Sequence, residues 1–129
     1  MTISYHDAAV FRTELRRFLR RSEEAARQSG ITPAQHLLLL QIAGADDEQT
    51  TVSELVDKLS LTQSAVTELV QRAEAAGLVA RRTSPDDGRV AHLRLTKDGA
   101  RRLEQVHRQL GPERAQLRRL VDNLEKNSA

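Results

Sequence analysis

Residues 53–99 read SELVDKLSLTQSAVTELVQRAEAAGLVARRTSPDDGRVAHLRLTKDG, which predicts two short helices, a hairpin and the start of a third helix. Ser53 is expected to cap the first helix and Thr62 the second, because each hydroxyl precedes a run of helically spaced apolar residues. Those apolar positions are Leu55, Val56 and Leu59, followed by Val66, Leu69, Val70 and Ala73. Each helix therefore has one face suited to a core.

A turn and a hairpin follow the second helix. Gly77 permits the left-handed conformation that ends many helices, and Leu78 supplies the apolar contact that often accompanies it. Strands are expected over residues 78–83 and 89–95, because the sequence SPDDG between them combines the fixed φ of proline with the freedom of glycine. Two helices followed by a hairpin are the layout of a winged helix-turn-helix, whose second helix enters the DNA major groove.

The face of the second helix opposite its apolar stripe is polar. It carries Gln63, Ser64, Thr67 and Gln71. Short hydroxyl and amide side chains can hydrogen-bond base edges or phosphates without blocking entry to the groove. The hairpin adds four arginines, and an arginine near its tip suits a narrow, electronegative minor groove. Taken singly, Arg82 or Arg94 is explained equally well by a basic hairpin that is exposed to solvent and does not contact DNA.

The run LTQSAVTELVQRAEAAGLVARR at residues 61–82, followed by SPDDGRVAHLRLTKDG, closely resembles the MarR family of bacterial transcriptional regulators. The resemblance extends over nearly the whole chain. It implies a homodimer that binds a pseudo-palindromic operator in double-stranded DNA, mostly represses, and is commonly released by a small ligand or an oxidant. It also implies that Gln63, Ser64 and Thr67 face the groove and that Arg89 is the wing arginine. The residues predicted to contact DNA are Thr62, Gln63, Ser64, Thr67, Gln71, Arg72, Arg82 and Arg89.

The chain departs from the family pattern at two positions. Glu68 stands on the predicted recognition helix, where a carboxylate repels phosphates unless it accepts a hydrogen bond from cytosine N4 or pairs with Arg72 four residues on. We favour the pair within the helix. Gly88 replaces the first of two wing arginines. Because glycine can shape the turn but cannot contact phosphate, the DNA contacts of the hairpin are expected to depend more on Arg89.

Other signals place the remaining helices. Thr32-Pro33-Ala34-Gln35 is a capping box with proline at the first helical position. The leucines at residues 37–40 place apolar side chains on nearly every side of the helix that follows. This helix is therefore expected in the middle of the fold. Thr96 is expected to cap the helix after the hairpin, and the acidic residues 44–49 are expected to form a loop.

Amphipathic helices flank this core at both ends of the chain. Their apolar positions are Phe11, Leu15 and Phe18 near one end, and Leu117, Leu120, Val121 and Leu124 near the other. A core this small cannot bury both faces, so a symmetric homodimer is expected to cover them. We predict one domain over residues 1–129, in which 31–95 form the winged core and 1–30 and 96–129 form the dimerisation helices.

Five arginines crowd residues 12–21. Such a cluster can bind nucleic acid. We favour instead a solvent-exposed helix face on which the long arginine side chains shield apolar surface. The family resemblance also implies an effector pocket where the dimerisation helices meet the winged core. Its predicted lining includes Arg16, His36 and Leu40, and His36 is otherwise a core histidine. Because Arg12, Arg16 and Arg20 lie nearby, a small anionic aromatic is the expected effector.

Composition excludes several other classes of protein. The chain has no cysteine, which removes thiol catalysis, disulfides and cysteine-based oxidant sensing. It has neither an apolar run long enough to span a membrane nor a signal peptide pattern, so the cytoplasm is the expected location. Net charge is only +2, so DNA affinity must come from local clusters of charge.

Chemistry at a metal or catalytic centre is not expected. Glu104 and His107 share a helix face, and Glu24 can approach His36, but neither pair extends to a compact set of metal ligands. No nucleophile, base and acid are spaced for catalysis, and no phosphate-binding loop follows a strand. We predict no enzyme activity, no metal and no cofactor. The competing hypothesis is a winged-helix module for protein contacts or chromosome architecture, with no operator of its own.

Overall fold

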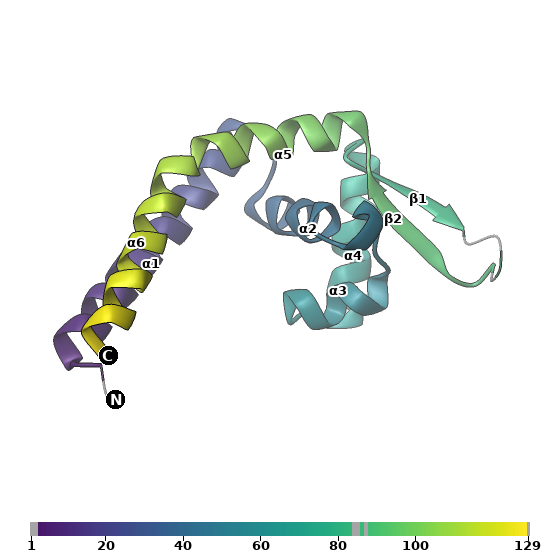
Figure 1. Cartoon of the computed structure of the whole chain (residues 1–129). Coiled ribbons are helices and arrows are strands. Elements are labelled where there is room, and N and C mark those ends of the chain that lie inside the picture. The colour runs from purple at the N-terminus through teal and green to yellow at the C-terminus, as the bar shows by residue number, and fades with distance from the viewer. Residues whose placement is uncertain (1–2, 84–85, 87, 129) are drawn as a thin grey trace.

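The structure, a computed structural model, describes residues 3–83, 86 and 88–128 and is mainly helical with a small antiparallel hairpin, which confirms the predicted fold class (Figure 1). The elements in chain order are α1 (Tyr5–Gln28), α2 (Pro33–Ala43), the short 3₁₀ turn η1 (Asp46–Glu48), α3 (Val52–Leu59), α4 (Gln63–Ala75), β1 (Val79–Thr83), β2 (Ala91–Leu95), α5 (Lys97–Gln109) and α6 (Gly111–Ser128). Leu78 lies just before β1 and is tied to the end of α4, because its N–H bonds the carbonyl oxygen of Ala73 at 2.9 Å.

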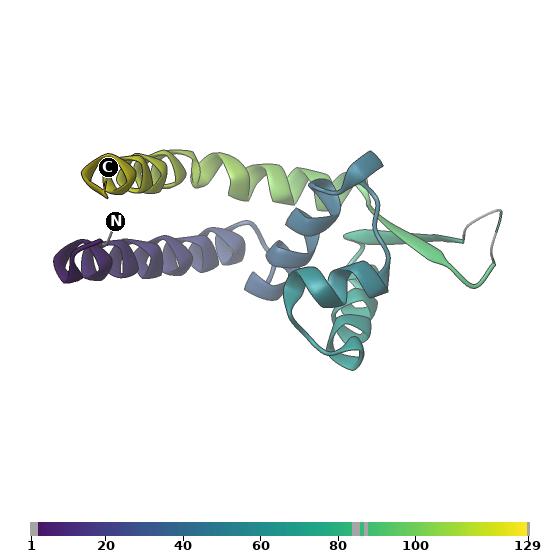
Figure 2. The same ribbon diagram turned by 60° about the horizontal axis from the view of Figure 1, so that its bottom comes forward.

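The helices form two parts, an arm made of α1 and α6 and a core made of α2, α3 and α4. Helices α1 and α6 run side by side, so the two ends of the chain lie together at one end of the molecule (Figures 1 and 2). Helix α5 continues from α6 toward the core, where α2, α3 and α4 pack together, and the hairpin projects from the far side. No helix in the part of the chain that the structure describes has the length and apolar character needed to span a bilayer.

Side-chain caps start the core helices, with one departure from the sequence-based prediction. Thr62 caps α4, Thr96 caps α5, and Thr32 forms the predicted capping box with Gln35. The predicted Ser53 cap of α3 is wrong, because Thr51 accepts the hydrogen bond from the Glu54 N–H at 3.2 Å. Ser53 lies inside the helix.

A short bridge between Thr50 and β2 explains why α3 starts where it does. Thr50 exchanges two backbone hydrogen bonds with Leu93, of 3.2 and 2.7 Å, and its hydroxyl donates to Glu54 at 2.8 Å. The chain leaves the bridge at Thr50, so Thr51 is the first residue free to cap the helix. This bridge fixes α3 against the base of the hairpin.

Helix α2 lies at the centre of the fold, as predicted, with its leucine run only partly covered. Leu38, Leu39 and Ile42 are fully buried against the rest of the core. Leu37 is 50% exposed and Leu40 is 42% exposed. The described chain therefore leaves part of this helix open.

A tight joint connects the end of α4 to the start of α5. Gly77 adopts the predicted left-handed conformation, and the Thr96 hydroxyl donates to its carbonyl oxygen at 2.6 Å. The Thr96 N–H donates to the carbonyl oxygen of Leu78 at 3.0 Å. Gly99 passes so close to Leu78 that a Cβ added there would overlap the same carbonyl oxygen. We refer to these four residues as the α4–α5 joint.

Arginine side chains extend this attachment to the arm. Arg102 donates to the carbonyl oxygen of Ser29, which follows the last residue of α1, at 2.9 Å. It also pairs with Asp98, and hydrogen bonds from Arg101 and Arg102 lower the pKa of the Asp98 carboxyl. A cation at the carboxyl end of a helix is favoured by the helix dipole. Helix α5 is thus attached both to the recognition helix and to the arm.

We predict that Gly99→Ala destabilises the protein although it lies in a helix, where alanine normally stabilises by about 0.5–1 kcal/mol. The added methyl group meets the Leu78 backbone, and overpacking of this kind costs about 1–3 kcal/mol. Urea unfolding measures the change. Gly111→Ala is the matched control, since nothing lies within 4 Å of a Cβ there and the same exchange should be neutral or stabilising. Equal stability of the two variants would contradict the proposed contact.

Candidate DNA-binding surface

Helix α4 has one buried face and one exposed polar face. Val66, Val70 and Ala73 are fully buried, while Gln63, Ser64 and Gln71 are exposed and Thr67 is half-buried. Thr62 is exposed at the start of the helix, and its hydroxyl accepts the Ala65 N–H at 3.1 Å. The helix therefore presents its amino end and a polar stripe to solvent, as the sequence predicted. The amino end of a helix carries unpaired N–H groups and a partial positive charge that favour phosphate.

The carboxylate on this helix is paired within the helix. Glu68 accepts a hydrogen bond from Arg72 at 2.7 Å, which confirms the favoured interpretation of this position. Both side chains are exposed, so the pair is exchangeable with other partners at little cost. Arg72 is thereby held on the exposed side of α4, next to Gln71.

The register of the hairpin sorts its arginines between two faces. Arg81 pairs across the strands with buried Leu93, and its side chain reaches back to Glu74 of α4 at 3.0 Å. Arg82 stands opposite His92, and Arg94 stands opposite Ala80, so these two arginines share the other face of the hairpin. The sequence did not single out Arg81 as a link between α4 and the hairpin. The feature of the sequence that pointed to this link was Glu74, a carboxylate one turn before Gly77 that can pair with a hairpin arginine.

The tip of the hairpin is described in part. Ser84, Pro85 and Asp87 of the predicted turn lie outside the described residues, while Asp86, Gly88 and Arg89 are described and exposed. Arg89 lies two residues before β2 begins at Ala91, in the connection between the two strands. Figure 1 shows this connection at the end of the hairpin away from the core. The structure therefore places α4 and an arginine-bearing hairpin next to each other, which is the arrangement that the predicted residue set requires.

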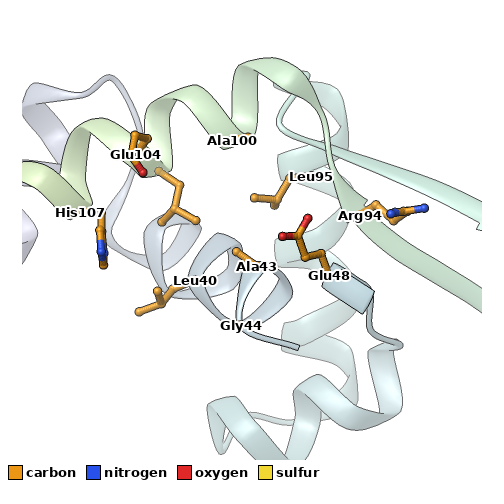
Figure 3. Close-up of a pocket in the computed structure, with 10 residues that line it drawn as sticks. Leu40, Ala43, Gly44, Glu48, Arg94, Leu95, Ala100, Glu104 and His107 are labelled. Carbon is orange, nitrogen blue, oxygen red and sulfur yellow. The ribbon is translucent and has the colours of Figure 1, made fainter. Parts of the chain in front are cut away.

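A hollow of about 460 Å³ lies between α2, α5 and the base of β2 (Figure 3). Leu40, Leu95 and Leu103 form much of its apolar lining, and Glu48, Arg94, Glu104 and His107 supply charged or polar groups. Glu104 accepts a hydrogen bond from Arg108 at 2.8 Å, so its charge already has a partner on the same helix. In Figure 3 the Glu48 carboxylate points toward the hollow and the Arg94 guanidinium points away from it.

The three residues predicted to line an effector pocket are not brought together here. Leu40 lines the hollow, but neither Arg16 nor His36 does. Arg16 is exposed on α1, while His36 is buried and faces Ser22 of α1. The family resemblance implied a pocket where the dimerisation helices meet the winged core. It missed Glu48 and Arg94, which approach only because η1 and β2 pack against the end of α2.

His36 lies where α1, α2, α5 and α6 meet. It is 6% exposed, and its Nδ1 lies 3.5 Å from the Ser22 hydroxyl oxygen. Burial, and then the positive charges of Arg114 and His107, lower the pKa of the His36 imidazole. Arg114 in turn lies 3.2 Å from both Nδ1 and the carbonyl oxygen of His107. The neutral imidazole is therefore the form that this environment favours.

Glu24, which sequence position allowed to approach His36, forms an ion pair on its own helix. Its carboxylate lies 3.9 Å from Arg21. Among the described residues no group of three or more histidine, cysteine or acidic side chains is arranged to hold a metal ion.

The fold and the exposed face of α4 define a winged helix-turn-helix protein. Residues 29–90 match a profile described as the MarR family. The chain is 34% identical over 83 residues to the HTH-type transcriptional repressor MdtR of Bacillus subtilis, covering 64% of this chain and 52% of that protein. It is also 34% identical over 76 residues to the uncharacterized HTH-type transcriptional regulator YdgJ of the same organism, covering 59% of this chain and 45% of that protein. The chain thus spans about half the length of these curated relatives.

A solved structure extends the similarity to nearly the whole chain. The structure of an E. coli MarR mutant complexed with operator DNA superposes with a TM-score of 0.67 at 28% identity, over 93% of this chain and 80% of that one. The chain is thus similar to the MarR family of winged helix-turn-helix transcriptional regulators in sequence over residues 29–90 and in fold over nearly its whole length. Both curated relatives are named as transcriptional regulators, which agrees with the prediction that this chain is not an enzyme.

We predict that His36 makes the fold less stable in mild acid. Because the folded-state pKa is lowered from its ordinary value of 6.5, the unfolded chain binds the proton more readily, and the free energy of unfolding falls as the pH drops below that value. Urea unfolding of the wild type and of His36→Gln, from about pH 7.5 to about pH 5.5, measures the effect. The variant should lose less stability over this range. Parallel curves for the two proteins would show that His36 is not the group responsible.

Proposed function

We propose that this chain is a homodimeric repressor that binds a pseudo-palindromic operator in double-stranded DNA. The observation that carries the proposal is the polar, exposed face of α4 beside an arginine-bearing hairpin, with the opposite face of α4 buried in the core. Helix α4 enters the major groove, and the hairpin contacts the flanking backbone or minor groove. The E. coli MarR complex with operator DNA supports DNA binding, and the repressor name of the B. subtilis relative supports repression.

The homodimer is supported by apolar residues that the single chain leaves uncovered. The chain has one tyrosine and two phenylalanines, all on α1, and none of them is buried. Tyr5 is 97% exposed, and Leu19 on the same helix is 51% exposed. Of the predicted stripe on α6 only Leu124 is buried. We therefore propose that residues 31–95 bind DNA and that residues 1–30 and 96–129 hold two copies together.

Release by a small organic ligand completes the proposal. We place the ligand in the hollow between α2 and α5, because this hollow lies where the arm meets the winged core. Its leucines can enclose an aromatic ring, and His107, or Arg94 after a change of rotamer, can bring a cation to a carboxylate there. A ligand changes DNA affinity only by binding one dimer shape more tightly than the other.

Selection of duplex DNA from a random pool tests the main proposal. We expect one enriched pseudo-palindrome whose half-sites are about 10 base pairs apart, because two recognition helices related by a two-fold axis engage successive turns of the groove. Binding to it should weaken steeply with salt, because phosphate contacts release counterions. No enrichment from the pool would instead support a winged-helix module that makes protein contacts or shapes the chromosome.

Substitutions should separate the hairpin from the recognition helix. We expect Arg89→Ala to weaken binding to most sequences by a similar factor, as a backbone or minor-groove contact does. Ser64→Ala and Thr67→Ala should instead alter base preference, by about 1–3 kcal/mol for each base-specific hydrogen bond removed. Fluorescence anisotropy on the selected duplex and on base-substituted versions measures both effects. Unchanged affinity of Arg89→Ala on every duplex would refute the role proposed for the hairpin.

Titration with salicylate tests the proposed effector. We expect salicylate to bind the free protein and to release it from the preformed DNA complex, with benzyl alcohol as the uncharged control. His107→Gln should weaken the response by removing the imidazole that meets the carboxylate, while DNA affinity without salicylate stays close to that of the wild type, since His107 is exposed and lies away from α4 and the hairpin. If salicylate neither binds nor releases DNA at millimolar concentration, the anionic aromatic effector is excluded and the DNA-binding proposal stands.

A further inference from the structure

Glu68 lies at the middle of the exposed face of α4, although it is not among the residues that the sequence predicted to contact DNA. An α-helix turns by about 100° per residue, so the positions two before and two after Glu68 point nearly opposite to it. These positions are Val66 and Val70, and both are fully buried. Thr67, which was predicted to face the groove, is half-buried. A helix that enters the groove with its exposed face forward therefore carries a carboxylate at the centre of its contact surface.

The salt bridge to Arg72 uses only part of this carboxylate. Arg72 Nη2 donates to Glu68 Oε1 at 2.7 Å, and no other described residue bonds Glu68 Oε2. The side chains of Glu68 and Arg72 are 62% and 74% exposed. A carboxylate has two acceptor oxygens, and a guanidinium has five N–H donors. One acceptor and several donors thus stand next to each other on the surface of α4.

The base edges in the major groove differ in how they receive a carboxylate. Guanine presents the acceptors O6 and N7 and thymine presents the acceptor O4, so both repel a carboxylate, whereas cytosine presents the N4 donor. Adenine presents a donor at N6 beside an acceptor at N7, which suits a side chain that both donates and accepts. An ionised carboxylate only accepts. Cytosine is therefore the base that fits Glu68 best.

Arg72 fits the guanine that pairs with this cytosine. A guanidinium only donates, and it makes two parallel hydrogen bonds to guanine O6 and N7. We propose that Glu68 and Arg72 together read one C·G base pair in each half of the operator, with Glu68 Oε2 accepting from cytosine N4 and Arg72 donating to guanine. This inference rests on the proposed binding of DNA by α4 and adds a base preference to it.

The salt bridge also reduces the cost of bringing a carboxylate close to phosphates. A lone carboxylate on α4 is repelled by the DNA backbone, whereas the Glu68–Arg72 pair has no net charge. A neutral pair adds little to the binding of DNA of any sequence, which comes from cations that neutralise phosphates. Its effect falls on discrimination, because a guanine or thymine in place of the cytosine meets the carboxylate with an acceptor.

Variants at Glu68 test the reading of this base pair on the duplex that selection from a random pool enriches. We expect the wild type to require one cytosine in each half-site, with roughly tenfold weaker binding when guanine or thymine replaces it. Glu68→Gln should move the preference to adenine, since an amide both donates and accepts. Glu68→Ala should bind all four duplexes about equally. Fluorescence anisotropy on duplexes that differ only at this base pair measures the preference.

A second variant tests the contact to guanine, and a third is the matched control. Arg72→Lys keeps the charge but loses the paired hydrogen bonds, so discrimination should fall at the same base pair and not at the others. Glu23→Gln is the control, because Glu23 forms an exposed salt bridge with Arg27, four residues on along α1. It removes the same charge from the arm and should enrich the same duplex as the wild type.

The outcomes separate this inference from the proposed function. If the wild type, Glu68→Ala and Glu68→Gln all enrich the same duplex, the reading of a C·G pair is overturned and the proposed operator binding stands. Equal weakening of Arg72→Lys on every duplex would overturn it as well, because that result is typical of a phosphate contact. The absence of any enrichment by the wild type would overturn both.

Discussion

The α4–α5 joint is the contact on which the arrangement of the DNA-facing surface depends. The Thr96 hydroxyl and Gly99 hold the first turn of α5 against the backbone of Gly77 and Leu78, which lie between α4 and β1. A rotation of α5 therefore moves the segment in which α4 ends. The Arg102 bond to Ser29 continues the same connection to α1. In the proposed homodimer, the spacing between the two copies of α4 therefore depends on the geometry of the arm.

The same constraint bears on the proposed release of DNA by a ligand. The hollow between α2 and α5 adjoins the side of α5 that carries Leu103 and His107, and His36 is buried at the other end of α2, beside α1. A group that enters the hollow, or a proton that reaches His36, acts on helices that are tied by the joint to α4. Packed elements of this kind shift between discrete arrangements, so a small local change can alter the separation of the two DNA-reading surfaces.

Local sequence signals predicted most of the fold because the decisive features are short-range. Caps at Thr32, Thr62 and Thr96 and the left-handed turn at Gly77 each depend on a few neighbouring residues. The cap of α3 was assigned two residues late, because its position depends on a bridge from Thr50 to a residue more than forty positions away. The position of Glu48 at the hollow was missed for the same reason. The Arg81 contact to Glu74 spans only seven residues, but it forms because the hairpin folds back against α4. For the DNA-contacting residues, the sequence predicted which side of α4 is exposed, and their roles in binding stay predictions.

In the proposed complex, α4 and the hairpin form one DNA-binding surface while the arm stays away from the duplex. Backbone amide chemical shifts of the labelled protein, recorded before and after addition of the selected duplex, test it most directly. We expect the largest changes on residues 62–72 and on the hairpin from Arg82 to Arg89, with small changes along the outer half of α1. Changes concentrated on α1 and α6, with α4 and the hairpin unaffected, would contradict it.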